Sequence, residues 1–76
     1  MKQVNIKFDT IVQIQNFVNS MSCYSSDVDL ISGNRTVDAK SIIGVFSLDI
    51  SKPIMLQASG KDEDAVIESV KNIIVE

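Results

Sequence analysis

The sequence predicts an α+β fold in which three helices lie on one face of a four-stranded, mostly antiparallel sheet, in the order β-α-β-β-α-β-α. Three observations lead to this prediction. Apolar and polar residues alternate near the start, in the middle and after the single proline, as is typical of half-buried strands. Two other segments carry apolar residues at helical spacing. Gly33-Asn34, between two alternating segments, is a hairpin signal.

The first strand and the first helix are predicted from a change of period. Residues 2–8 alternate, and the side chains expected to face the core are Val4, Ile6 and Phe8. Helical spacing follows from about Thr10, with an expected apolar stripe of Ile11, Ile14, Phe17, Val18 and Met21. Asp9 or Thr10 can cap this helix by accepting a backbone N–H.

The middle of the chain predicts a hairpin followed by a short helix. Residues 27–32 alternate, Gly33-Asn34 turns the chain, and a short strand is expected at residues 35–37. A short helix is expected within residues 38–48, capped by either Asp38 or Ser41. Gly44 lies inside this helix, where glycine costs about 1 kcal/mol relative to alanine.

The last strand and the last helix complete the order. Alternation after Pro53 predicts a strand, which ends at Gly60. Negative charge at Asp62, Glu63 and Asp64 suits a first helical turn, because the helix dipole favours anions there. The expected apolar stripe of this helix is Val66, Ile67, Val70, Ile73 and Ile74.

Length and composition limit the possible functions. The 76 residues allow one domain, residues 1–76, and a domain of this size buries only about 60% of its unfolded surface. A net charge of −3 without a basic cluster argues against nucleic-acid binding. The apolar runs are too short for a membrane helix and no leader segment is evident, so we expect a cytoplasmic protein.

Few residues could support chemistry. The chain contains no histidine, which excludes His-based acid–base catalysis and phosphohistidine. Cys23 is expected to be a small buried hydrophobe rather than a reactive thiol. Asp62, Glu63 and Asp64 are expected to be charges at a helix start rather than a magnesium site. We therefore expect no enzyme activity, no cofactor and no metal.

Ser41 is the exception, because it stands at or just before a helix start. Unpaired N–H groups point to such a position and would favour a phosphate. Ile42, Ile43 and Phe46 follow at spacings that leave apolar area beside it. A phosphorylation site next to an exposed apolar patch and a plain helix cap are both compatible with this spacing.

Three segments carry a family resemblance: residues 26–34 with the Gly33-Asn34 turn, residues 37–48 around Ser41, and residues 58–65 at the entry to the last helix. Through them residues 24–74 resemble the HPr family, the phosphocarriers of the bacterial sugar phosphotransferase system, whose regulatory-serine segment matches residues 37–48. The resemblance implies the family's open-faced sandwich, the same element order as derived above.

The resemblance fails at the family's active loop. HPr carries its phosphoryl group on a histidine within a Gly-Ile-His-Ala-Arg-Pro loop. Residues 8–13 stand there in this chain, with Thr10 at the histidine position and Val12 at that of the phosphate-binding arginine. We therefore expect phosphocarrier activity to be absent.

A histidine-free subclass of the family, acting in catabolite repression, keeps the regulatory serine. By this resemblance Ser41 would be phosphorylated by HPr kinase/phosphorylase, and the product would bind the catabolite control repressor. Ile42, Ile43 and Phe46 would supply apolar docking, with Lys40 beside the phosphate. The alternative is a degenerate HPr-like scaffold that binds an unknown protein without phosphorylation.

Overall fold

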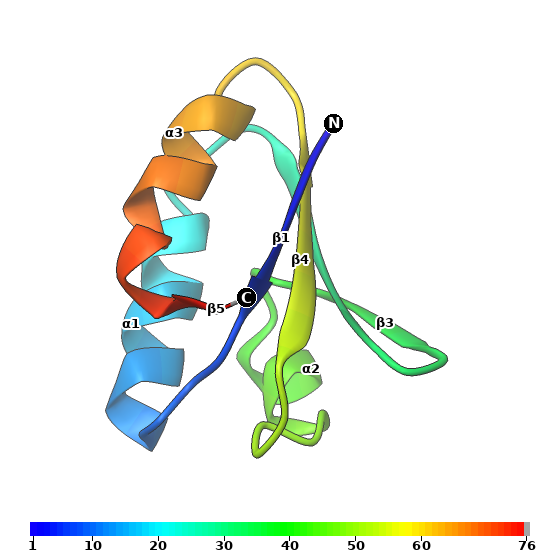
Figure 1. The fold of residues 1–76 in the computed structure, drawn as a ribbon. Coiled ribbons are helices and arrows are strands. Elements are labelled where there is room, and N and C mark those ends of the chain that lie inside the picture. Colours follow the sequence, from blue (N-terminus) through cyan, green and yellow to red (C-terminus); the bar gives the residue numbers. More distant parts are fainter. Residues whose placement is uncertain (76) are drawn as a thin grey trace.

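A computed structural model describes residues 1–75 of the chain. The elements are β1 (Lys2–Ile6), α1 (Ile11–Met21), β2 (Asp27–Ser32), β3 (Arg35–Asp38), α2 (Ile42–Phe46), β4 (Ile54–Ser59), α3 (Glu63–Ser69), the 3₁₀ turn η1 (Lys71–Ile73) and β5 (Ile74–Val75). The strands form one sheet of order β3-β2-β4-β1-β5, antiparallel throughout. Figure 1 shows the helices on one face of this sheet, with the other face uncovered. The predicted α+β class is confirmed.

The hydrophobic core lies between the sheet and the helices. Alternate residues of the central strands supply its floor, namely Ile6, Val28, Leu30, Ile54, Leu56 and Ala58. From α1 the buried side chains are Ile14, Phe17, Val18 and Met21. Phe17 also meets Phe8 edge to face, with ring centroids 5.2 Å apart. Full burial of one such large side chain stabilises the fold by about 1.5–3 kcal/mol, so this alternation determines which face the helices cover.

The end of the chain differs from the prediction, because the sheet has five strands rather than four. The last helix ends at Ser69, and Ile74 pairs with Ile6 of β1 where helix was expected. The amide of Lys7 also donates to the carbonyl of Ile73 at 3.0 Å. The β-branched residues Ile74 and Val75 fit a strand as well as a helix, and the free edge of β1 decides between the two.

Two residues expected in the core lie at the surface. Ile11 is 59% exposed, because the first turn of α1 extends past the end of the sheet. Cys23 is also exposed, in the turn after α1, where its thiol donates to the carbonyl of Asn19 at 3.7 Å. Helical spacing predicts which residues share a stripe, but the length of the packing partner decides how much of the stripe is buried.

Candidate functional site

Ser41 is the N-cap of α2, so of the two predicted caps it is this residue that is used. Its Oγ accepts a hydrogen bond from the N–H of Gly44 at 3.2 Å, and its N–H donates to the carbonyl of Asp38 at 3.0 Å. The side chain of Asp38 instead accepts from the N–H of Lys40 at 2.9 Å. The Ser41 hydroxyl is exposed and accepts from a backbone N–H that has no partner within the helix, and this is the position where an added phosphate would find donors.

Gly44 gives the Ser41 hydroxyl its room. A Cβ at position 44 would lie 3.3 Å from Ser41 Oγ and 3.3 Å from Cβ of Val37, closer than most side chains tolerate. Glycine at this position costs about 1 kcal/mol in helix propensity, but it leaves room for the Ser41 hydroxyl that accepts from the Gly44 N–H.

The short helix α2 presents apolar side chains to solvent. Val45 is fully buried, whereas Ile42, Ile43 and Phe46 are 38%, 81% and 43% exposed. With one residue every 100°, a helix of five residues can turn only part of its surface inward, and here Val45 takes that place. The three residues predicted for docking are thus together and accessible beside Ser41.

Two residues at the start of α1 are further exposed apolar side chains at this end of the molecule. Ile11 is 59% and Val12 is 62% exposed, and α1 packs against α2. Figure 1 shows the first turn of α1 and the helix α2 at the same end of the molecule. We call Ile11, Val12, Ile42, Ile43 and Phe46 the apolar patch. Ile11 was missed as a patch residue because its spacing matches the buried stripe.

Thr10, at the expected position of the missing histidine, has a structural task. Its Oγ1 accepts from the N–H of Gln13 at 3.2 Å as the N-cap of α1, and the Gln13 side chain accepts from the N–H of Asp9 at 2.7 Å. Val12, at the arginine position, offers no donor. The nearby Lys7 ammonium lies 3.7 Å from the Asp9 carboxylate.

Lys40 does not direct its ammonium at Ser41 in this structure. Its Nζ donates to the carbonyl of Tyr24 at 2.9 Å, in the segment between α1 and β2. Arg35, which the sequence reading did not single out, reaches α2 from the hairpin. Its guanidinium donates to the carbonyl and the hydroxyl of Ser47, at 3.1 and 3.0 Å. This contact satisfies a carbonyl at the end of α2 and holds the short helix against β3.

Asp62 ties the start of α3 to the segment before β2. Its carboxylate accepts from the N–H groups of Ser25 and Ser26, both at 2.9 Å, and from the Ser26 hydroxyl. These hydrogen bonds, that of the Ser26 hydroxyl first, favour the charged form and lower the pKa of Asp62 to about 2. Among residues 1–75 no group of three His, Cys, Asp or Glu could hold a metal ion.

The low pKa of Asp62 predicts how stability depends on acid. The pKa of Asp62 is lower in the folded state than its ordinary value of 3.8, so the charged carboxylate stabilises the folded state. This stabilisation is complete above about pH 3.8 and is lost as the pH falls toward about 2. We expect Asp62→Asn to lower the melting temperature at pH 6 and to flatten its fall between pH 4 and 2. Thermal melts across this range measure it. Asp64→Asn, which keeps Asp62, should retain the wild-type slope; an equally steep fall in Asp62→Asn would contradict the assignment.

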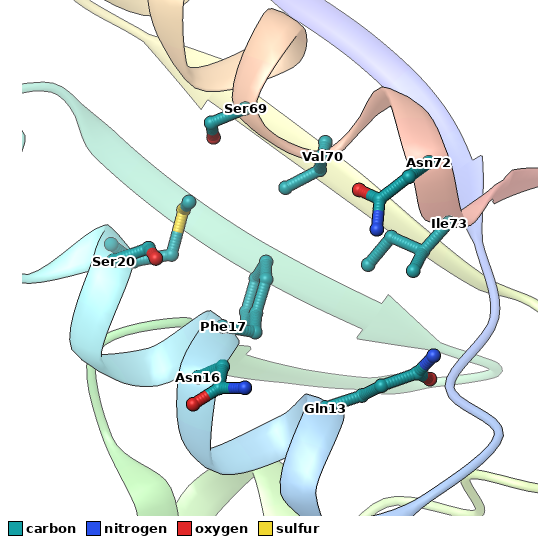
Figure 2. A pocket seen from close by; sticks show the side chains of 9 residues that line it. Gln13, Asn16, Phe17, Ser20, Ser69, Val70, Asn72 and Ile73 are labelled. Carbon is teal, nitrogen blue, oxygen red and sulfur yellow. The ribbon is translucent and has the colours of Figure 1, made fainter.

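A groove of about 150 Å³ lies between α1 and the segment formed by α3 and η1. Figure 2 shows carboxamides and hydroxyls at its rim, and Phe17 and Val70 among its apolar lining. The full lining is Gln13, Asn16, Phe17, Ser20, Met21, Ser69, Val70, Asn72 and Ile73. It contains no side chain that titrates near neutral pH, so its chemistry is limited to neutral hydrogen bonding. Neither Ser41 nor any residue of the apolar patch lines this groove.

No helix within residues 1–75 has the length and apolar character needed to cross a bilayer.

Comparisons with known proteins agree with this geometry. A family profile described as the PTS HPr component phosphorylation site matches residues 13–76. The HPr-like protein Crh of Bacillus subtilis is 31% identical over 80 aligned positions, covering 99% of this chain and 94% of its own length.

Solved structures give the same result. HPr-C-His from Thermoanaerobacter tengcongensis superposes with a TM-score of 0.85 at 32% identity, covering 95% of this chain and 89% of that one. The crystal structure of Bacillus subtilis Crh, described as a swapped-domain dimer, gives 0.71 at 27% identity, with coverage of 93% and 88%. The resemblance noted in the sequence is thereby confirmed.

Proposed function

The chain belongs to the HPr family of the phosphotransferase system, and on that premise we propose that it is a regulatory, protein-binding domain switched by phosphorylation of Ser41. Under this proposal residues 1–76 form one HPr-like domain that acts in the cytoplasm by binding proteins and catalyses no reaction. The observation that carries it is the exposed Ser41 hydroxyl at the start of α2, directly beside Ile42 and Ile43.

Phosphorylation would change the charge of this site strongly. The γ-phosphoryl group of ATP is transferred to Ser41 Oγ, ADP leaves, and the hydroxyl proton passes to the kinase. The phosphoserine adds a charge of about −1.5 to −2 at neutral pH next to the apolar patch. The Gly44 N–H, which already points at Oγ, offers a donor to the new oxygens. A partner could then recognise charge and apolar contact together, as we propose for the catabolite control repressor.

Loss of the phosphocarrier role follows from the residues at the active-loop position. The chain has no histidine, so it cannot form the phosphoramidate from which the family transfers its phosphoryl group. Thr10 Oγ1 is engaged as a helix cap, and Val12 provides no guanidinium to clamp a phosphate. These features support a domain that is regulated by phosphorylation and does not transfer a phosphoryl group to another protein.

Treatment with HPr kinase/phosphorylase and ATP tests the proposal. We expect mass spectrometry to show one added phosphoryl group on the wild-type protein and none on Ser41→Ala. Ser47→Ala removes an exposed serine from the other end of α2 and should still be modified. An unmodified wild-type protein, or modification that persists in Ser41→Ala, would refute it.

A second candidate is an HPr-like scaffold that works without phosphorylation. It is favoured by one observation, that Ile43 is 81% exposed in the unmodified protein and so needs no switch to become accessible. Under this alternative the unmodified protein binds its partner as tightly as the phosphorylated protein does. A comparison of the two forms in the same binding assay separates the candidates.

A further inference from the structure

The face of the sheet that no helix covers (Figure 1) has a row of mostly apolar residues across four strands, interrupted by Asn5. Strand register places Ile31 of β2 opposite Met55 of β4, and Asn5 of β1 lies between Met55 and Val75 of β5. Met55 is 36% exposed, and Ile31 and Val75 are half-buried. A shallow depression lined by Gln3, Val4, Asn5 and Met55 lies along this row. The row therefore offers apolar contact across several strands.

Three carboxylates lie on the same face, beside the apolar row. Asp29 of β2 is directly opposite Asp38 of β3, and Asp27 lies two residues earlier on β2, on the same side. Like charges directly opposite one another destabilise an antiparallel pair. Within residues 1–75 none of the three forms an ion pair, because the four ion pairs all involve other carboxylates. The face thus has a formal charge of −3 that is not neutralised from within.

The basic residues in or next to β1 and β3 are directed elsewhere. Lys2 and Arg35, the two basic residues within the strands, point to the helical side, where they contact Asp64 of α3 and Ser47, the residue after α2. Lys40, the base nearest to Asp38 in sequence, donates to the carbonyl of Tyr24. Lys7, just beyond β1, lies near Asp9. The remaining seven acidic residues are balanced by the seven basic ones, so the net charge of the chain equals that of this face.

From this arrangement we infer that the open face of the sheet is a second docking surface, which binds a cationic, amphipathic segment of a protein partner. Lysine or arginine side chains of the partner lie against Asp27, Asp29 and Asp38, and its apolar residues lie on Ile31 and Met55. The surface is distinct from the apolar patch, because its residues belong to the opposite face of the sheet.

Charge decides between this occupant and a second copy of the chain. Two copies stacked through this face would bring carboxylates together with no basic side chain in the strands to meet them, and such like-charge contacts oppose association. A cationic segment instead relieves the repulsion between Asp29 and Asp38, and its own apolar side chains bury surface against the apolar row.

Nuclear magnetic resonance with a defined peptide tests the inference. The probe is acetyl-Lys-Thr-Lys-Thr-Val-Thr-Ile-amide, in which an extended conformation puts both lysines, the valine and the isoleucine on one side, and the control peptide has glutamate at both lysines. We expect the lysine peptide to shift amide signals of β2, β3 and β4 and to leave those of α2 unchanged. The glutamate peptide should give no shifts. Binding should weaken when the salt concentration rises from about 20 mM to about 500 mM.

Matched variants locate the interaction. Asp29→Asn/Asp38→Asn should bind the lysine peptide about fivefold more weakly, because two exposed charge contacts are lost. Its melting temperature should equal or exceed that of the wild type, since a repulsive pair is removed. Asp64→Asn/Glu68→Gln makes the same change of charge on α3 and should retain the affinity. Shifts centred on α2, equal binding of the glutamate peptide, undiminished binding by the strand variant, or self-association through this face would each overturn the inference.

Discussion

Replacing Gly60 with alanine should destabilise the protein by about 3 kcal/mol or more, since steric overlap and an unfavourable backbone conformation add together. A Cβ at position 60 would lie 2.5 Å from Ser26 Oγ and 2.8 Å from Ser26 Cα. Ser26 is 2% exposed, and its N–H and hydroxyl are both bound to Asp62, so it cannot move aside without breaking that contact. Gly60 also has a φ of 150°, which L-residues rarely adopt.

This loss is large relative to the total free energy of unfolding expected for a chain of this size, about 4–11 kcal/mol. Urea unfolding measures it as a shift of the midpoint at constant slope. Gly33→Ala is the control, because Gly33 has a φ of 61° but nothing within 4 Å of an added Cβ. It should cost only about 1–2 kcal/mol, the penalty of the left-handed conformation. If Gly60→Ala were no worse than Gly33→Ala, the proposed packing of Gly60 on Ser26 would be wrong.

Under the proposed function, Ile43→Ala should weaken binding of the Ser41-phosphorylated protein to the catabolite control repressor by about tenfold or more, because a few well-packed residues carry most of the energy of an interface. Ile43 is 81% exposed in the free protein, so its truncation should change folding stability by less than about 0.5 kcal/mol. Titration calorimetry with the phosphorylated variant measures the affinity, and a thermal melt verifies the fold.

Met55→Ala is the matched control for this result. Met55 is also an exposed apolar residue, but it lies on the open face of the sheet, away from α2. Its truncation should leave the affinity for the repressor within about twofold of wild type, a difference of about 0.4 kcal/mol. The reverse pattern, with Met55→Ala weakened and Ile43→Ala unaffected, would show that the repressor uses the open face and would refute the role of the apolar patch.

Local patterns predicted where several residues of the candidate site lie, because those residues are close together in the sequence. The cap and the exposed apolar side chains all lie within residues 41–46, namely Ser41, Ile42, Ile43 and Phe46. Spacing alone therefore predicted that they lie together. Ile11 belongs to the same surface but comes from the start of another helix. Its helical spacing suggested burial, and only the tertiary structure shows that the first turn of α1 extends past the end of the sheet and stays exposed.

The sequence by itself determined the α+β class, the two-residue hairpin and the absence of the phosphocarrier histidine, because period, turn residues and composition are properties of neighbouring residues or of the whole chain. The tertiary structure alone decided that Ile74 adds a fifth strand beside β1, and that Asp62 binds Ser26, 36 positions away. Each of these pairings depends on which groups the packed core brings to one another, and apolar alternation does not specify that partner.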